Sequence, residues 1–145
     1  MGKASHLTNR LFVDANILVR CSVGRAGLNA AELLAKGVVL ATTDAQAREA
    51  AKVLHHVFGV PEAEAATEMA DVVSLMEVYQ LPTYRASEAA ARARMHYKNL
   101  RDWPILAAAI SSDSAIWTDD RDFFGVGVPV WASNNIGFVE AGIDR

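Results

Sequence analysis

The sequence has few of the features that mark secreted or membrane-spanning proteins. It contains a single cysteine, Cys21, among 145 residues, so no disulfide can form within one chain and an intracellular protein is expected. Residues 1–10 lack the apolar run of a signal peptide. No apolar stretch approaches the ~18 residues that a membrane-spanning helix needs. We therefore expect a cytoplasmic protein without a membrane segment, in which Cys21 is a small buried apolar residue.

An excess of positive charge is also lacking. The formal net charge is −3, so the overall charge does not indicate nucleic-acid binding, and any such binding would need a local basic face. The most basic part of the chain lies between Tyr84 and Arg101. Because Glu88 is in the same segment, it is either a charge-balanced, solvated surface or a face that contacts phosphates. The candidates for phosphate contact are Arg85, Arg92, Arg94 and Lys98.

Internal repeats, linkers and low-complexity runs are absent as well. Hydrophobic residues make up 52% of the chain, which argues against disorder. A length of 145 residues suits one domain with a core of ordinary size. We therefore predict that residues 1–145 form a single domain.

The sequence that is present alternates between short apolar strands and helices. This alternation predicts a three-layer α/β/α domain with a central, mostly parallel sheet. Asn16 is expected to cap the first helix, and Asp102 with Pro104 marks the start of a late apolar helix. Residues 132–145 carry no confident assignment. We predict strands over 11–13, 38–41, 77–81, 115–117 and 128–131, and helices over 15–20, 29–36, 45–58, 62–76, 84–97 and 103–110.

Four acidic residues fall where this topology would bring them to one edge of the sheet. Asp14 ends the first strand and Asp120 follows a later one, while Glu49 and Asp102 lie near the starts of helices. In parallel α/β sheets these positions meet at the carboxyl edge, where ligands bind. Each residue also has a plainer interpretation: Asp14 and Asp102 as helix caps, and Glu49 as a solvated surface residue.

Four carboxylates at one edge of the sheet repel one another, so their negative charge must be offset by cations or protons. Two of them ~4 Å apart repel by roughly 4 kcal/mol at an effective dielectric constant near 20. No set of histidines and cysteines accompanies them, and the adjacent His55 and His56 cannot form an i,i+4 metal-binding pair. Ligation by oxygen alone suits Mg²⁺ or Mn²⁺, and such a site fits the attack of water on a phosphodiester.

These residues carry a resemblance to a known family. The run Phe12–Asn16, the helical Glu49, Asp102 before an alanine-rich helix, and the block Thr118–Phe123 together resemble the PIN domain family. The similarity covers nearly the whole chain and is strongest to the small single-domain members typified by VapC toxins. It implies that Asp14, Glu49, Asp102 and Asp120 form the acidic site. It further implies supporting roles for Asn16, Thr118 and Asp122, and it leaves Asp119 outside the set.

The same resemblance implies a function and partners. It implies an endoribonuclease dependent on Mg²⁺ or Mn²⁺ that acts on RNA as the toxin of a type II toxin–antitoxin pair. A small antitoxin protein would be its inhibitor, and a homodimer is expected. One alternative is a non-catalytic binding module with the same fold. A second is a phosphotransfer domain with an aspartate nucleophile, which is disfavoured because Asn16 stands where haloacid-dehalogenase-like phosphatases have aspartate. A receiver domain would need a lysine that residues 128–131 lack.

Overall fold

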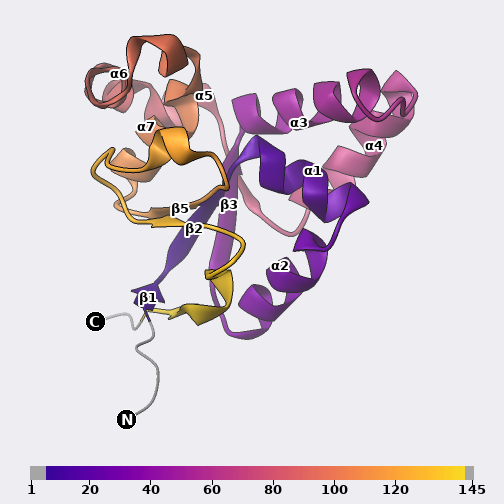
Figure 1. The fold of residues 1–145 in the computed structure, drawn as a ribbon, viewed down its shortest axis with the longest axis horizontal. Coiled ribbons are helices and arrows are strands. Elements are labelled where there is room, and N and C mark those ends of the chain that lie inside the picture. Colours follow the sequence, from indigo (N-terminus) through magenta and orange to yellow (C-terminus); the bar gives the residue numbers. More distant parts are fainter. Residues whose placement is uncertain (1–5, 143–145) are drawn as a thin grey trace.

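The computed structural model, which describes residues 6–142, has a central sheet of five parallel strands. Figure 1 shows the helices packed around this sheet. The strand order is β4-β3-β2-β5-β6, and each neighbouring pair runs parallel. The predicted three-layer α/β/α fold with a mostly parallel sheet is therefore confirmed. The strands are β2 (Arg10–Val13), β3 (Val39–Thr43), β4 (Glu77–Tyr79), β5 (Ala115–Trp117) and β6 (Val130–Trp131).

The central strand β2 buries both of its faces. Leu11 and Val13 point into one hydrophobic cluster and Phe12 into the other, because successive side chains of a strand alternate. Helices cover both faces of the sheet, as is usual for parallel sheets. The first layer contains α1 (Ala15–Val23), α2 (Ala26–Ala35), α3 (Asp44–His56) and α4 (Glu62–Val73). The second contains α5 (Leu81–Tyr84), α6 (Glu88–Arg94) and α7 (Trp103–Ser111).

The carboxyl ends of the central strands lead directly into helix starts. The backbone N–H of Asp14 donates to Trp117 O at 3.0 Å, which ties the end of β2 to the end of β5. Thr43 ends β3 and caps α3, because its hydroxyl accepts a hydrogen bond from the N–H of Gln46 at 3.1 Å. The helix predicted over 45–58 therefore begins one residue earlier, at Asp44. The first residues of α1 and α3 are thereby held at one edge of the sheet.

One predicted helix is wrong. The segment 84–97 is not continuous: it breaks into the end of α5, the 3-10 turn η1 (Arg85–Ser87) and α6, and the backbone is extended at Met95 before η2 (Tyr97–Asp102). The buried Tyr84 donates its hydroxyl to Asp44 Oδ1 at 2.5 Å, which fixes α5 against the start of α3. Met95 packs in the same cluster as α7. These tertiary contacts override helix propensity, which is a weak preference.

Other boundaries differ locally from the predictions. Asn16 does not cap α1; Asp14 does, because its Oδ1 accepts from the N–H of Ala15 at 2.8 Å. Strand β4 ends at Tyr79 rather than at residue 81, because Pro82 lies in the first turn of α5. Helix α4 ends at Val73, and β6 comprises only two of the four predicted residues.

The C-terminal segment closes the end of the sheet opposite the acidic residues. The 3-10 turn η4 (Ile136–Phe138) leads into β7 (Val139–Ala141), which pairs in parallel with β1 (His6–Thr8). These short elements carry too little pattern for prediction, but Ile136 and Val139 are buried in the core. Residues 1–5 and 143–145, which the single-domain prediction includes, lie outside the described residues. Between residues 6 and 142, no helix combines the length and the apolar character that crossing a bilayer requires.

Candidate active site

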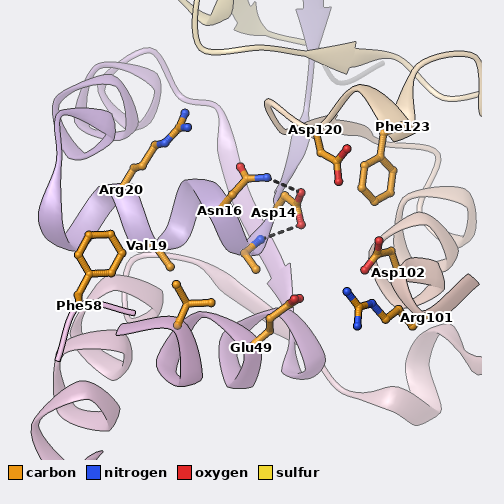
Figure 2. Close-up of a pocket in the computed structure, with 12 residues that line it drawn as sticks. Asp14, Asn16, Val19, Arg20, Glu49, Phe58, Arg101, Asp102, Asp120 and Phe123 are labelled. Carbon is orange, nitrogen blue, oxygen red and sulfur yellow. Dashed lines mark hydrogen bonds between the residues drawn. The ribbon is translucent and has the colours of Figure 1, made fainter. Parts of the chain in front are cut away.

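The four acidic residues singled out in the sequence line one pocket. Asp14, Glu49, Asp102 and Asp120 surround a cavity of about 370 Å³ at the carboxyl edge of the sheet (Figure 2). They come from the start of α1, from α3, from the residue before α7 and from the loop after β5. Residues far apart in the chain therefore reach a common space because parallel strands end at the same edge.

Asp14 is the most buried of the four, with 7% of its surface exposed. Its carboxylate accepts hydrogen bonds from Ala15 N–H at 2.8 Å, from the Thr118 hydroxyl at 2.6 Å and from the Asn16 amide at 3.1 Å. Burial raises the pKa of Asp14 to about 6. The bonds from Thr118 and Ala15 oppose this rise in pKa, and the charges of Asp102 and Glu49 add to it.

Asp102 occupies the capping position of α7, but its side chain makes no capping hydrogen bond. The interpretation of Asp102 as a helix cap is therefore wrong, and its carboxylate is available to the pocket. Burial raises its pKa, and the charges of Glu49, Asp120 and Asp122 act in the same direction, whereas Arg101 lowers it. Asp102 thus lies in a field of neighbouring negative charge.

Thr118 links the first and the last acid of the set. Its hydroxyl donates to Asp14 Oδ2 and accepts the N–H of Asp120 at 3.0 Å. Asp120 Oδ1 in turn accepts the N–H of Asp122 at 2.9 Å, while the exposed Asp122 side chain does not line the pocket. Asn16 and Thr118 therefore orient Asp14, and the backbone of Asp122 orients Asp120.

Glu49 projects from an exposed position of α3 into the same pocket (Figure 2). One turn earlier, the buried Gln46 accepts the N–H of Ala15 through Oε1 at 2.9 Å. This bond fixes α3 against α1 at the base of the pocket. Gln46 was not predicted as a site residue, although its spacing of three residues from Glu49 places it near the same helix face.

Two arginines that were not predicted as site residues also line the pocket, Arg20 and Arg101. Arg20 forms an ion pair with Asp119, which also accepts the backbone N–H and the hydroxyl of Ser133, both at 2.7 Å. Burial alone would raise the pKa of Asp119, but Ser133 and Arg20 outweigh it and hold that pKa below its usual range. Arg101 reaches toward Asp102 and Glu49 (Figure 2). Because Arg101 directly precedes Asp102 in the sequence, it could have been predicted to lie beside the pocket.

The cations proposed from the sequence as phosphate contacts lie elsewhere. Arg92 pairs with Glu88 at 2.8 Å and stacks over the ring of Trp103, and Arg94 donates to Val126 O at 3.4 Å. None of the four lines the acidic pocket: Arg85, Arg92, Arg94 and Lys98.

The donor chemistry of the pocket fits a hard divalent cation. The set consists of carboxylate oxygens, and Asp14 accepts three hydrogen bonds where an ionised carboxylate offers about four lone-pair positions. Across the described range 6–142, however, no three His, Cys, Asp or Glu side chains stand close enough to hold a metal ion together. Binding would thus require the carboxylates to move closer together, and Glu49 lies at an exposed position of α3.

The family model described as the PIN domain matches residues 12–140, so the chain belongs to the PIN domain family. No curated protein matches the sequence. The structure of VapBC2 from Rickettsia felis, bound to a DNA fragment from its promoter, has a TM-score of 0.67 at 17% identity. That alignment covers 85% of this chain and 98% of the other.

Two further solved structures share the fold. A toxin–antitoxin complex from Klebsiella pneumoniae has a TM-score of 0.61 at 21% identity, covering 83% of this chain and 95% of the other. PAE2754 from Pyrobaculum aerophilum has a TM-score of 0.64 at 19% identity, covering 88% and 85%. At these identities the similarity establishes the fold alone.

Proposed function

We propose that this PIN domain protein is an endoribonuclease that depends on Mg²⁺ or Mn²⁺ and hydrolyses RNA phosphodiester bonds. The observation that carries the proposal is the convergence of Asp14, Glu49, Asp102 and Asp120 on one pocket. A divalent cation held there would lower the pKa of an attacking water and offset charge on the leaving oxygen.

The residues of the chain have distinct roles in this proposal. Asp14, Asp102, Asp120 and Glu49 would hold the cation. Thr118 and Asn16 fix the carboxylate of Asp14 through the hydrogen bonds described above, so that its free lone pair faces a defined direction. Arg101, at the wall of the pocket, would attract the substrate phosphate that the carboxylates repel.

We further propose that the protein is the toxin of a type II toxin–antitoxin pair and acts in the cytoplasm as a homodimer. The toxin role is supported by two solved structures that share the fold, VapBC2 from Rickettsia felis and a toxin–antitoxin complex from Klebsiella pneumoniae. The inhibitor would be a small antitoxin protein. Expressing the protein from a tightly controlled promoter should arrest growth of the host, and an upstream neighbouring gene should relieve the arrest. No arrest at confirmed expression would contradict the toxin role.

The competing candidate is a binding module with a PIN fold and no activity. It is favoured by one observation, the absence of a pre-formed group of three metal ligands in the described range. Calorimetric titration with Mn²⁺ separates the two candidates. The nuclease proposal expects saturable binding that is lost in Asp14→Asn, together with RNA cleavage that chelation abolishes. If Mn²⁺ titration gives no heat of binding and RNA is not cleaved, the inactive binding module is the better explanation.

A further inference from the structure

The acidic pocket opens into a second cavity along α3. This cavity of about 320 Å³ shares Glu49, Arg101 and Asp102 with the acidic pocket, so the two spaces adjoin. Its remaining lining includes Arg48 and Lys52. We call it the basic groove, defined by Arg48, Lys52 and Arg101. A chain that leaves the acidic pocket on this side meets three cationic side chains.

The cations of the basic groove come from two sides. Arg48 and Lys52 are one turn apart on α3 and therefore lie on the same face of that helix. Arg101 belongs to η2, immediately before α7, and faces them across the groove. Cations on opposite walls can contact one phosphate, or two adjacent phosphates, from different directions.

These cations are available to a ligand. Arg48 forms only a long ion pair, 3.8 Å to Asp44, and its side chain is 67% exposed. Asp44 is already engaged by the N–H groups of Ala45 and Leu81 and by the hydroxyl of Tyr84. Within residues 6–142, Lys52 and Arg101 form no direct ion pair, and Arg101 acts on Asp102 only through its charge, which lowers the Asp102 pKa. This contrasts with Arg92, which Glu88 already neutralises at 2.8 Å.

The groove also lies at the starts of two helices. Ala45 and Gln46 of the first turn of α3 and Pro104 of the first turn of α7 line it. Helix N-termini carry partial positive charge and favour anions. The N–H groups of Ala45 and Gln46 are already bonded to Asp44 and Thr43, so the attraction is electrostatic and would not add hydrogen bonds.

We propose that the basic groove binds the backbone phosphate of single-stranded RNA that adjoins the phosphate held at the acidic pocket. This inference rests on the proposed nuclease function and adds which side of the pocket the strand follows. A groove that tracks a flexible backbone with cations is the usual way of binding single strands without reading their sequence. The strand would run from the acidic pocket past Arg101 and along α3.

The test compares two variants that each remove three positive charges. The groove variant carries Arg48→Gln, Lys52→Gln and Arg101→Gln. The matched variant carries Arg85→Gln, Arg92→Gln and Lys98→Gln, from the segment that the sequence suggested for RNA contact. Both are made on the Asp14→Asn background so that RNA stays intact. Fluorescence anisotropy measures binding of a labelled oligouridylate over a range of salt concentrations, and thermal melting confirms that both variants fold.

The expected result is a difference in salt dependence. For single strands the slope of log K against log salt changes by about 0.7 for each phosphate contact, so the groove variant should flatten the slope by about 2. The matched variant should keep the slope of the background protein. A groove variant with an unchanged slope, or a matched variant with an equal loss, would overturn the inference.

Failure of this inference can be told apart from failure of the proposed function. If the wild type cleaves RNA but the groove variant keeps its salt slope, the nuclease proposal stands and the groove is wrong. If the slope falls as expected but the wild type, loaded with Mn²⁺, cleaves no RNA, the groove stands and the nuclease proposal is wrong.

Discussion

Two carboxylates at the same edge of the sheet have opposite surroundings. Asp14, at the end of β2, has two acidic neighbours that raise its pKa and no ion pair among the described residues. Asp119, two residues after β5, is paired with Arg20 and bonded twice to Ser133, and its pKa is lowered. Sequence position alone does not distinguish them, because both follow an apolar strand.

The difference separates a stabilising acid from a costly one. One pKa unit corresponds to about 1.4 kcal/mol, so a shift of the Asp14 pKa from 3.8 to about 6 means that its ionised form costs roughly 3 kcal/mol of folding free energy. The lowered pKa of Asp119 means that its ionised carboxylate stabilises the folded protein. Strongly perturbed carboxylates in a pocket are candidates for function, whereas satisfied ones belong to the scaffold.

The largest expected effect is on catalysis. Asp14→Asn and Asp102→Asn should each lower RNA cleavage by more than ~100-fold. Mutation of residues that only support metal ligands already lowers metal affinity or activity about 10–100-fold, and these two residues would be ligands themselves. Asp71→Asn is the matched control, since Asp71 is exposed on α4 and does not line the pocket. Cleavage is followed on a labelled RNA with Mn²⁺. Wild-type rates in both pocket variants would remove Asp14 and Asp102 from the site.

The second prediction concerns stability and pH. Asp14→Asn should stabilise the metal-free protein at pH 7 by about 1–3 kcal/mol; it removes a buried charge, but an amide accepts fewer of the three hydrogen bonds. The raised pKa means that the folded wild type binds more protons than the unfolded chain between pH 3.8 and about 6. Wild-type stability therefore falls as the pH rises through this window.

Urea unfolding at several pH values checks this prediction. The gain from Asp14→Asn should be smallest below pH 4 and should reach its plateau above about pH 6, because the wild-type carboxylate is protonated in acid. A gain that does not depend on pH would show that packing, and not charge, is responsible.

Asp119→Asn should have the opposite sign and a smaller effect. It removes the ion pair with Arg20 and weakens the two bonds to Ser133, and a loss of about 1–2 kcal/mol is expected at pH 7. The lowered pKa means that this contribution is present above the unfolded pKa and is lost on acidification. The same urea series measures it. Equal and same-signed effects of Asp14→Asn and Asp119→Asn would abolish the distinction between the two carboxylates.

The sequence could predict that the four acidic residues lie close together, because their positions follow from topology. Asp14, Asp102 and Asp120 lie at strand ends or helix starts, and a parallel sheet brings such positions to one edge. The residues that support or neighbour these acids were harder to predict from the sequence. Gln46 contacts Ala15 across 31 positions of sequence, and Arg101 was seen only as part of a basic run. The break between Tyr84 and Met95 depends on long-range contacts that no local pattern contains.

The smallest expected effect comes from Thr118, whose hydrogen bond orients Asp14 but not Asp119. Thr118→Val keeps the side-chain volume but removes the hydroxyl that donates to Asp14 Oδ2 at 2.6 Å and accepts from Asp120. Mn²⁺ affinity, measured by calorimetry, should fall by about 10-fold, the lower end of the range for residues that orient metal ligands. Thr118→Ser retains the hydroxyl and should restore most of the affinity. If serine and valine weaken Mn²⁺ binding equally, Thr118 acts by packing, and the hydrogen bond to Asp14 does not prepare the pocket for a cation.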